Sequence, residues 1–426
     1  MAVDTTTYLA DAKIIYGSIQ DQVSTKAAIM NLFGDGSKFG KPINNIGIRG
    51  YVFLARIRPN WNLGYRIEGV TGVGAAGNQG LANATVVLKY AYVPITITGQ
   101  AENLTKGESR AFMQAKALEA KYDMMDIVSH VNVVVAGANR GGELARVAAP
   151  AAGSFTADNA GGLPGAIYLR VNQIIDTMAV GGGAKTLDSA TITAINYGTR
   201  VVTVPGTAVA GEAVALEDEY PIVVGNFPIT AEGLISLISD AGAIQGLNPA
   251  TAGEESWASY LRAVGGALSS SVLQELCQFV QNRGGQPLDM LLFPSAQINQ
   301  YVAIATTTLR FNTDMARTAG QKKALNLGYE TYAYGNKLIV EDKDLRPDRV
   351  FGGASEMMKK FEAIPLSLAE DEAGAWTRVS GASGIADAVM GLLRWYHNIG
   401  ILQRSSWGVL ETLTVPAAFA TAPPTL

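Results

Sequence analysis

The chain has 426 residues, 48 % of them hydrophobic, which is enough for about two to four domains. Only 16 % are charged and the net charge is −4, so composition gives no support for nucleic-acid binding through phosphate neutralisation. Low charge combined with 47 glycines favours a surface that neighbouring subunits cover. A β-rich protein with many small residues is the plainer alternative.

The single cysteine, Cys277, excludes an intrachain disulfide. It lies in an apolar helical pattern, which predicts a buried, unreactive thiol. The N-terminus lacks a basic segment followed by an apolar run, so we expect no signal peptide. No stretch of about 18 apolar residues occurs, so we expect no membrane span.

The first elements are a helix and an arm. Apolar residues recur at helical spacing over residues 8–33 and predict a helix. The glycine-rich stretch 34–42 breaks this pattern and predicts an extended arm.

Two strand-like stretches follow, at 51–58 and 84–98, and the glycine-rich stretch 69–80 lies between them. They predict a projecting β-hairpin over residues 48–98, in which 84–98 is one continuous strand. A two-stranded hairpin on its own is marginally stable in water. We therefore expect another chain to hold it down.

A long helix is predicted at 106–136, directly after this hairpin. Thr105 and Glu108 have the spacing of a capping box, and Gly137 is the expected stop. About 30 residues give a rod of roughly 45 Å. The last turns, Val131 to Val135, are apolar nearly all round, so we expect that end to be buried.

The middle of the chain predicts a second β unit. Residues 139–165 are rich in small residues and proline, and are predicted to be irregular. The apolar stretch 167–178 fits either a strand or a helix. Short alternating segments separated by turn residues then predict a small inserted β-domain at 185–225.

A largely helical region is predicted over 230–283, ending at Gly284–Gly285. Two apolar faces support it, formed by Trp257, Tyr260, Leu261, Val264 and Leu268, and by Val272, Leu276, Phe279 and Val280. The later predicted elements are a buried strand at 289–293, a helix at 295–305, a hairpin at 329–340, mixed strands over 350–413 and a loose tail at 417–426.

Few residues suggest chemistry. His130 and His397 are the only histidines, and each is interpreted as a core or interface residue. With one cysteine, a tetrahedral zinc site is not expected. Gly72 to Gly77 matches a dinucleotide-binding pattern, but a strand follows it and no acidic residue lies between Glu68 and Glu102. A glycine-rich loop tip is the better interpretation.

Two further stretches contain glycine or acidic residues that binding sites also use. Gly181 to Thr186 lacks the first glycine of a phosphate-binding loop. The acidic group Glu341 to Asp344 fits a solvated turn better than a cation site, because it lacks the glycine and the distal glutamate of a calcium loop. We therefore predict no catalytic, cofactor-binding or metal-binding residues, no cofactor and no enzymatic activity. An enzyme with an unrecognised carboxylate site remains an alternative.

The order of these parts resembles the major capsid protein of tailed bacteriophages, the Hong Kong ninety-seven type of fold. The stretches 284–295 and 328–342 resemble its axial-domain strand with the following helix and its later hairpin. The resemblance implies an α+β fold with an arm, an extended hairpin loop, a long spine helix, a peripheral domain, an axial domain and an inserted β-domain. The implied divisions are 1–47 for the N-terminal helix and arm, 48–98 for the hairpin loop, 99–184 for the peripheral domain, 185–225 for the inserted domain, 226–352 for the axial domain, and 353–426 for the return to the peripheral domain and the tail.

The resemblance also implies a function: hexamers and pentamers that form an icosahedral head shell around viral double-stranded DNA, without sequence-specific binding. Portal and scaffolding or decoration proteins are the implied partners, no membrane is involved, and the protein is expected in the virion after assembly in the host cytoplasm. An encapsulin-type shell housing a cargo enzyme is the alternative. Some family members cross-link lysine to asparagine. Lys89 lies on the predicted loop, but the sequence identifies neither a partner nor a catalytic acid for it.

Overall fold

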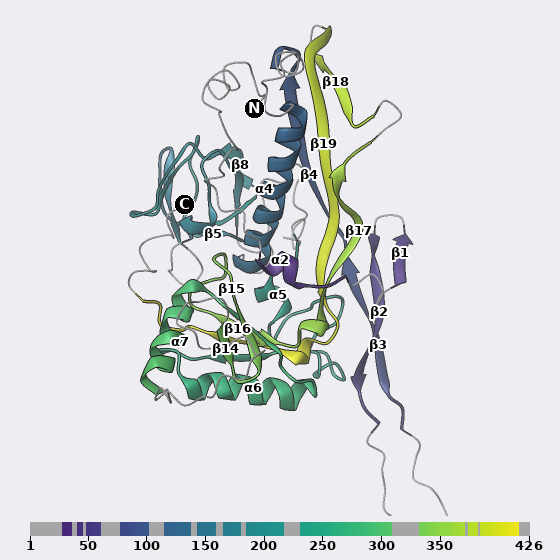
Figure 1. Cartoon of the computed structure of the whole chain (residues 1–426), viewed down its shortest axis with the longest axis vertical. Helices are drawn as coiled ribbons and strands as arrows, with labels where there is room; N and C mark the ends of the chain where they lie inside the picture. Colours follow the sequence, from purple (N-terminus) through teal and green to yellow (C-terminus); the bar gives the residue numbers. More distant parts are fainter. Residues whose placement is uncertain are drawn as a thin grey trace, which may run out of the picture.

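The computed structural model describes most of the chain, and the rest of this section concerns the described ranges. These are residues 28–35, 41–45, 48–60, 77–101, 115–137, 143–158, 165–179, 185–216, 231–308, 332–370, 374–381 and 384–416. Figure 1 shows an upright helix beside long strands, a sheet unit to one side, and a mixed unit of helices and strands below. The predicted α+β class is confirmed.

A three-stranded antiparallel sheet carries the hairpin. Strand β2 (Ile48–Arg58) pairs with β3 (Gly80–Val87) on one edge and with β1 (Lys41–Asn45) on the other. Phe53 and Ala55 on β2 are buried, whereas Leu54 between them is exposed. Side chains that alternate between core and solvent are what a half-buried strand requires. The dinucleotide-like pattern in the predicted tip lies outside the described residues, apart from Gly77.

The predicted continuous strand at 84–98 is wrong. It is broken at Leu88, and its second half, β4 (Lys89–Thr98), leaves the hairpin to pair with β19 (Gly384–Ile401). The Leu88 side chain is buried, and the carbonyl of Val87 accepts a hydrogen bond from Asn398 Nδ2 at 2.7 Å. These contacts end the hairpin before Lys89, so that lysine lies in the long sheet and not on the loop.

Helix α4 (Ala115–Gly137) stands alongside β4 and β19 (Figure 1). Its last turns, from Asn132 to Gly137, are buried, which confirms the prediction for that end. Residues 102–114 and the proposed capping residues Thr105 and Glu108 lie outside the described ranges. On its other edge β19 pairs with β17 (Met358–Leu368) and β18 (Trp376–Gly381), so one strand of 18 residues unites the long sheet.

A seven-stranded sheet forms the unit on the left of Figure 1. In spatial order its strands are β8 (Lys185–Thr191), β7 (Ile174–Met178), β11 (Ala213–Leu216), β5 (Ala145–Ala151), β6 (Ser154–Asp158), β10 (Val201–Thr203) and β9 (Ala194–Asn196). The prediction of irregular structure at 139–165 is wrong, because β5 and β6 form a hairpin whose turn is closed by Gly153 with a positive φ. The predicted boundary at 184/185 runs through this sheet.

A mixed six-stranded sheet forms the lower unit in the order β12 (Tyr260–Ala263), β20 (Trp407–Glu411), β16 (Val350–Gly353), β13 (Met290–Phe293), β15 (Lys337–Glu341) and β14 (Tyr332–Tyr334). We call it the axial sheet. It includes β20, which the predicted divisions had assigned to the returning peripheral segment. The predicted strand at 289–293 and the hairpin at 329–340 are confirmed.

Helices α6 (Ser270–Gly284) and α7 (Ser295–Thr308) pack on one face of the axial sheet. The Ser269 side chain accepts a hydrogen bond from Val272 N, and Gly285 ends α6 in the left-handed conformation that favours glycine. Cys277 of α6 is buried as predicted, and burial raises the pKa of its thiol. The opposite face of the sheet joins the core that also contains the hairpin and α4.

The prediction of a largely helical region at 230–283 is wrong before α6. Only α5 (Leu234–Leu237) is helical there, and Tyr260 lies in β12, which gains a parallel ladder with β20. Phe279 was grouped on one apolar face with Val272, Leu276 and Val280, but it is exposed where those three are buried. Its ring stacks on that of Tyr260 at 5.0 Å. Tertiary strand pairing therefore overrides the local helical spacing.

We predict that Gly353→Ala destabilises the axial sheet. A methyl group at this position would overlap the ring of the fully buried Trp407, whose Nε1 donates to Ala354 O at 3.0 Å. Overpacking of this kind costs about 1–3 kcal/mol. Urea unfolding followed by tryptophan fluorescence measures the loss. Gly266→Ala is the matched control, because no atom lies within 4 Å of its new methyl group; equal midpoints for the two variants would contradict the prediction.

Candidate assembly surface and the joint behind it

The outer face of the hairpin exposes two large apolar side chains to solvent. Leu54 is 62 % exposed and Leu81 is 56 % exposed. In the antiparallel register Leu54 lies opposite Asn83, and Leu81 lies opposite Arg56, so the four side chains share one face. We call these four residues the hairpin outer face. Two large apolar groups beside an arginine resemble the composition of protein–protein interfaces.

The inner face of the same hairpin is fixed to the rest of the chain. Tyr51 donates its hydroxyl proton to Glu362 O at 2.8 Å and packs against the ring of Phe361 at 5.3 Å. Thr85 N donates to Gln245 O at 2.8 Å. The base of the hairpin is therefore held by its own chain, and contact of the hairpin with another chain stays a prediction.

A second exposed cluster lies on the outer face of the long sheet. The rings of Tyr90 and Tyr92 meet the ring of Tyr396 at 4.7 and 5.8 Å, and the hydroxyls of Tyr92 and Tyr396 are 2.8 Å apart. Burial, followed by the hydrogen bond to Tyr396, raises the pKa of Tyr92 to about 12. The Tyr92 hydroxyl therefore keeps its proton at physiological pH. Tyrosine is enriched in the energetically important parts of interfaces.

The inner face of the long sheet carries His397, which is 2 % exposed and stacks on Trp395 with 3.8 Å between ring centroids. Within the described part of the chain, neither ring nitrogen has a hydrogen-bond partner. Burial lowers the pKa of His397 to about 4, so the ring is neutral at pH 7. The interpretation as a core or interface residue is confirmed for His397. His130 is exposed on α4, so an interface position for it stays a prediction.

A buried joint connects α2 (Ala28–Leu32), α4 and the axial sheet behind these surfaces. Asn132 Nδ2 of α4 donates to Asp342 Oδ2 at 3.0 Å and to Asp344 Oδ2 at 2.8 Å. Ile29 N of α2 donates to Asp342 Oδ2 at 3.1 Å. Both aspartates are less than 5 % exposed, so the predicted solvated turn at Glu341 to Asp344 is wrong. The missed signal is that the turn follows β15, which pairs with the fully buried strand β13.

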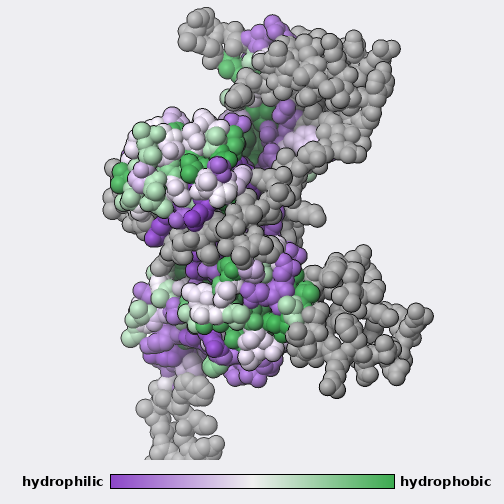
Figure 2. All heavy atoms as spheres, turned by 90° about the vertical axis from the view of Figure 1, so that its left-hand side faces the viewer, coloured by the Kyte–Doolittle hydropathy of each residue, from purple (hydrophilic) through white to green (hydrophobic). Residues whose placement is uncertain are grey.

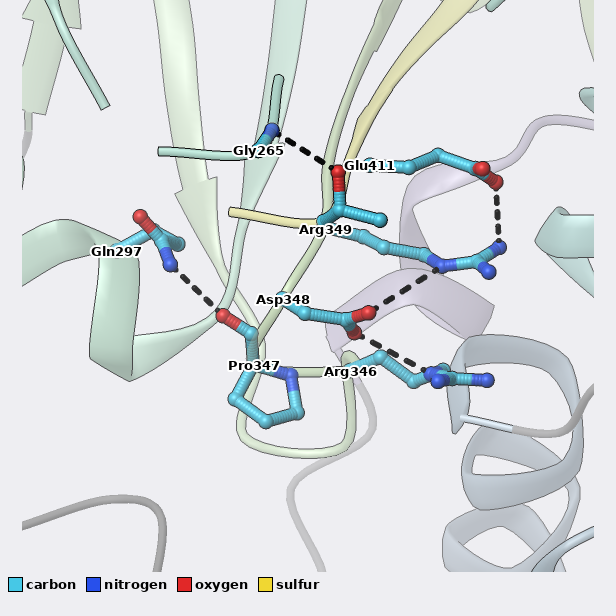
Figure 3. A network of polar contacts seen from close by, with 8 residues as sticks. Gly265, Gln297, Arg346, Pro347, Asp348, Arg349 and Glu411 are labelled. Carbon is cyan, nitrogen blue, oxygen red and sulfur yellow. Dashed lines mark hydrogen bonds and ion pairs between the residues drawn. The ribbon is translucent and has the colours of Figure 1, made fainter. Parts of the chain in front are cut away.

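The loop continues from this joint as a polar network, drawn in Figure 3. Arg346 and Arg349 flank Asp348, with Arg346 Nε 3.3 Å from Asp348 Oδ1, and Arg349 pairs with Glu411 of β20 at 2.9 Å. Gln297 Nε2 of α7 donates to Pro347 O at 2.9 Å. These contacts fix the loop to both α7 and β20, so the joint has a rigid support.

Arg404 supports the segment from α5 to β12. It is fully buried, and its guanidinium donates to five backbone carbonyls at 3.0 to 3.5 Å. The acceptors are Leu237, Gly242, Trp257, Ser236 and Ala241. Hydrogen bonds to charged groups contribute about 1.5–3 kcal/mol each, and unpaired buried carbonyls are costly. One side chain therefore organises a long irregular segment that also contacts the hairpin.

Other kinds of site find little support. Within the described ranges no group of three or more metal-binding side chains comes together. None of the helices described is long and apolar enough to cross a membrane. Figure 2 shows the side of the molecule opposite the hairpin, where the surface over the axial unit is mainly hydrophilic and that over the seven-stranded sheet is mixed. The hairpin strands β2 and β3 lie on the other side of the molecule (Figure 1).

Sequence comparisons identify no relative: no model of a known protein family matches the chain, and no curated protein matches it. Solved structures do match. The cyanophage A-1(L) capsid asymmetric unit aligns over 96 % of this chain and 99 % of its own, with a TM-score of 0.52 and 11 % identity. The chain therefore has the fold of a phage major capsid protein.

Two further solved structures align over 97 % of this chain at lower similarity. The structure of Mycobacterium phage Adephagia is covered over its whole length, with 11 % identity and a TM-score of 0.45. The holo-SrpI encapsulin complex from Synechococcus elongatus PCC 7942 is covered over 96 % of its length, with 8 % identity and a TM-score of 0.43.

We predict that acid weakens the long sheet through His397. In the folded chain the pKa of His397 lies below the ordinary value of about 6.5. Unfolding therefore takes up a proton as the pH falls from about 6.5 towards 4, and the folded state loses stability over that range. The loss is on the order of 1–3 kcal/mol. His397→Phe keeps an aromatic ring on Trp395 and removes this acid sensitivity, as measured by urea midpoints at several pH values. The control His130→Phe alters an exposed ring and retains the sensitivity; an unchanged slope in His397→Phe would contradict the prediction.

Proposed function

We propose that this chain is a structural protein that self-assembles into hexamers and pentamers of an icosahedral head shell enclosing viral double-stranded DNA. The observation that carries the proposal is the alignment with a cyanophage capsid subunit over 96 % of this chain and 99 % of that one. A match of this extent covers the hairpin, the long helix and both sheet units. Fold alone does not determine function, so the surface must supply the rest of the argument.

The hairpin outer face is the first surface feature that supports assembly. Leu54 and Leu81 point away from the chain that holds the hairpin base. Full burial of one leucine side chain contributes about 1.5–3 kcal/mol, so covering both by a neighbouring subunit is a substantial gain. A shell repeats such a contact in every subunit, and many modest interfaces then add up to a stable particle.

The low charge content is the second feature that supports assembly. Only 16 % of the residues are charged, and the exposed clusters on the hairpin and the long sheet consist mainly of leucine and tyrosine. Burial of such surface avoids the large desolvation cost of charged groups. The net charge of −4 fits DNA that is enclosed without being bound sequence-specifically. On this proposal the chain is not an enzyme, and it works with portal and scaffolding or decoration proteins in the virion after assembly in the host cytoplasm.

Electron microscopy of the purified full-length chain, alone and with co-expressed phage proteins, tests the proposal. Closed particles built from rings of five and six subunits are expected. Monomers under all these conditions would contradict it. The contents decide between the two kinds of shell, because nuclease-protected DNA supports a phage head and a protein cargo supports an encapsulin-type compartment.

We predict that Leu54→Glu combined with Leu81→Glu prevents particle formation. Two new carboxylates on the hairpin outer face would have to be desolvated against the neighbour, which costs several kcal/mol in total on the scale of buried unpaired charges. Particle yield in sucrose gradients is expected to fall at least about tenfold, which corresponds to about 1.4 kcal/mol.

The matched control is Leu54→Met combined with Leu81→Met, which keeps the face apolar at similar volume and retains assembly. Circular dichroism checks that both double variants fold, which is expected because neither leucine is buried in the chain. Normal particles from the glutamate variant would show that this face is not an interface.

A further inference from the structure

The joint defined above connects three segments that are far apart in the sequence. Asp342 accepts from Ile29 N, more than 300 positions away, and from Asn132 Nδ2, more than 200 positions away. Asp344 accepts from the same amide group of Asn132 at 2.8 Å, and its own N donates to Asp342 Oδ1 at 2.8 Å. One asparagine therefore bridges two carboxyl groups, and through them α2, α4 and the axial sheet are held together.

Apolar contacts surround these hydrogen bonds but do not replace them. The ring of Phe33, just after α2, meets the ring of Trp407 edge-on at 6.3 Å, and Trp407 is fully buried in β20. Gly137 at the end of α4 leaves room for the ring of Tyr168 and for the carbonyl of Asp344. The carboxyl groups thus lie in a closely packed region with little solvent.

The electrostatics of the pair are unfavourable when both groups are ionised. Among the described residues, the hydrogen bonds that the two carboxyl groups accept come from neutral donors: Ile29 N, Asn132 Nδ2 and Asp344 N. Two buried like charges that accept from the same amide group repel each other in a medium of low dielectric constant. One of the pair is therefore expected to retain a proton at a pH at which exposed aspartates have lost theirs.

Other charged groups near the pair moderate this effect. Lys343 of its own loop and Arg170, after the short helix η1 (Ala166–Tyr168), carry the opposite charge and act on Asp344. Arg346 and Asp348 of the same loop act, together with Asp344, on the phenol of Tyr168. Arg346 is engaged with Asp348, and the sequence of α2 contains no titratable side chain. Lys343 and Arg170 favour the ionised form, but burial and the charge of Asp342 outweigh them and raise the pKa of Asp344 to about 6.

The hydrogen-bond pattern indicates which member takes the proton. Asp342 accepts from two backbone N–H groups as well as from Asn132, and these donors stabilise its anion. Asp344 accepts only the amide of Asn132 among the described groups, so its anion is less well solvated. Protonation of Asp344 removes the repulsion and adds an O–H donor beside Asp342.

We propose that this joint is a proton-dependent coupling between the axial sheet and the long helix: uptake of one proton by the Asp342–Asp344 pair tightens it, and release of that proton loosens it. The bound proton stabilises the joint at low pH, and this stabilisation is lost as the pH rises through the pKa of the pair in the folded state. This coupling belongs to the single chain and goes beyond the proposed role in a shell.

Hydrogen–deuterium exchange of the full-length chain tests the proposal at about pH 5 and about pH 7.5, with protection factors used so that the intrinsic pH dependence of exchange cancels. Peptides that cover 28–32 and 128–137 report on the joint. If opening exposes Asp344 to water, the opening constant is about tenfold smaller at about pH 5 than at about pH 7.5. The reference is the buried face of α6, 272–280, on the far side of the axial sheet, which should not change.

Two variants make the test specific. Asp344→Asn places a neutral isostere in the joint, so protection of both peptides should become independent of pH. Asp348→Asn is the matched control, because it removes a carboxylate from the same loop that is ion-paired with Arg346; the tenfold difference should persist there. If Asp344→Asn does not fold, Asp342→Asn provides the second variant, since loss of the repelling charge should also reduce the pH dependence.

Equal protection at the two pH values in the unmodified chain, or an unchanged tenfold difference in the folded Asp344→Asn or Asp342→Asn variant, overturns the proposal. The measurement compares samples in the same assembly state, whether particles or free subunits. Failure to form shells therefore bears on the proposed function alone, and a flat exchange profile bears on the joint alone.

Discussion

The ladder between β4 and β19 is the interaction on which the architecture depends. It runs from Thr98 opposite Ala388 to Lys89 opposite His397, and it takes the second half of a long extended segment away from the hairpin. Because β19 also pairs with β17 and β18, a single strand determines where the hairpin ends and which face of the sheet meets α4. The outward direction of Leu54 and Leu81 is set on the hairpin side of that break, where Phe53 faces the core and Leu81 lies opposite Arg56.

Local signals predicted those parts of the fold that local physics determines. Gly285 ends α6 in the left-handed conformation, and Gly335 turns the hairpin between β14 and β15, as the sequence indicated. The apolar end of α4 is buried as expected. Elements that depend on distant partners were missed: β12 exists because β20 lies beside it, and the break at Leu88 exists because Asn398 and β19 compete for the chain. Neither partner is visible within a local window of sequence.

The same reason explains why the joint was missed. Glu341 to Asp344 has the composition of a solvated turn, and nothing in its own sequence indicates that Asn132 and Ile29 will cover it. Its acidic residues are tolerable in a buried position only because the amide of Asn132 and two backbone N–H groups are directed at them. Arg404 shows the same principle with opposite charge, since five carbonyls from one irregular segment surround its guanidinium. A single sequence reveals the charged residue but not the distant groups that compensate it.

The two buried titratable sites respond to acid in opposite directions. His397 has a lowered pKa, so protons work against the long sheet that holds the hairpin base, whereas the Asp342–Asp344 pair favours the proton at the joint with the axial sheet. As the pH falls, Asp344 takes up its proton before His397 does, because the pKa of Asp344 is the higher of the two. A moderate fall in pH should therefore stiffen the connection between the axial sheet and α4 while the long sheet remains intact. In a subunit whose neighbours contact the hairpin, this difference in pKa would change the stability of the joint relative to that of the long sheet. Neither of them would unfold.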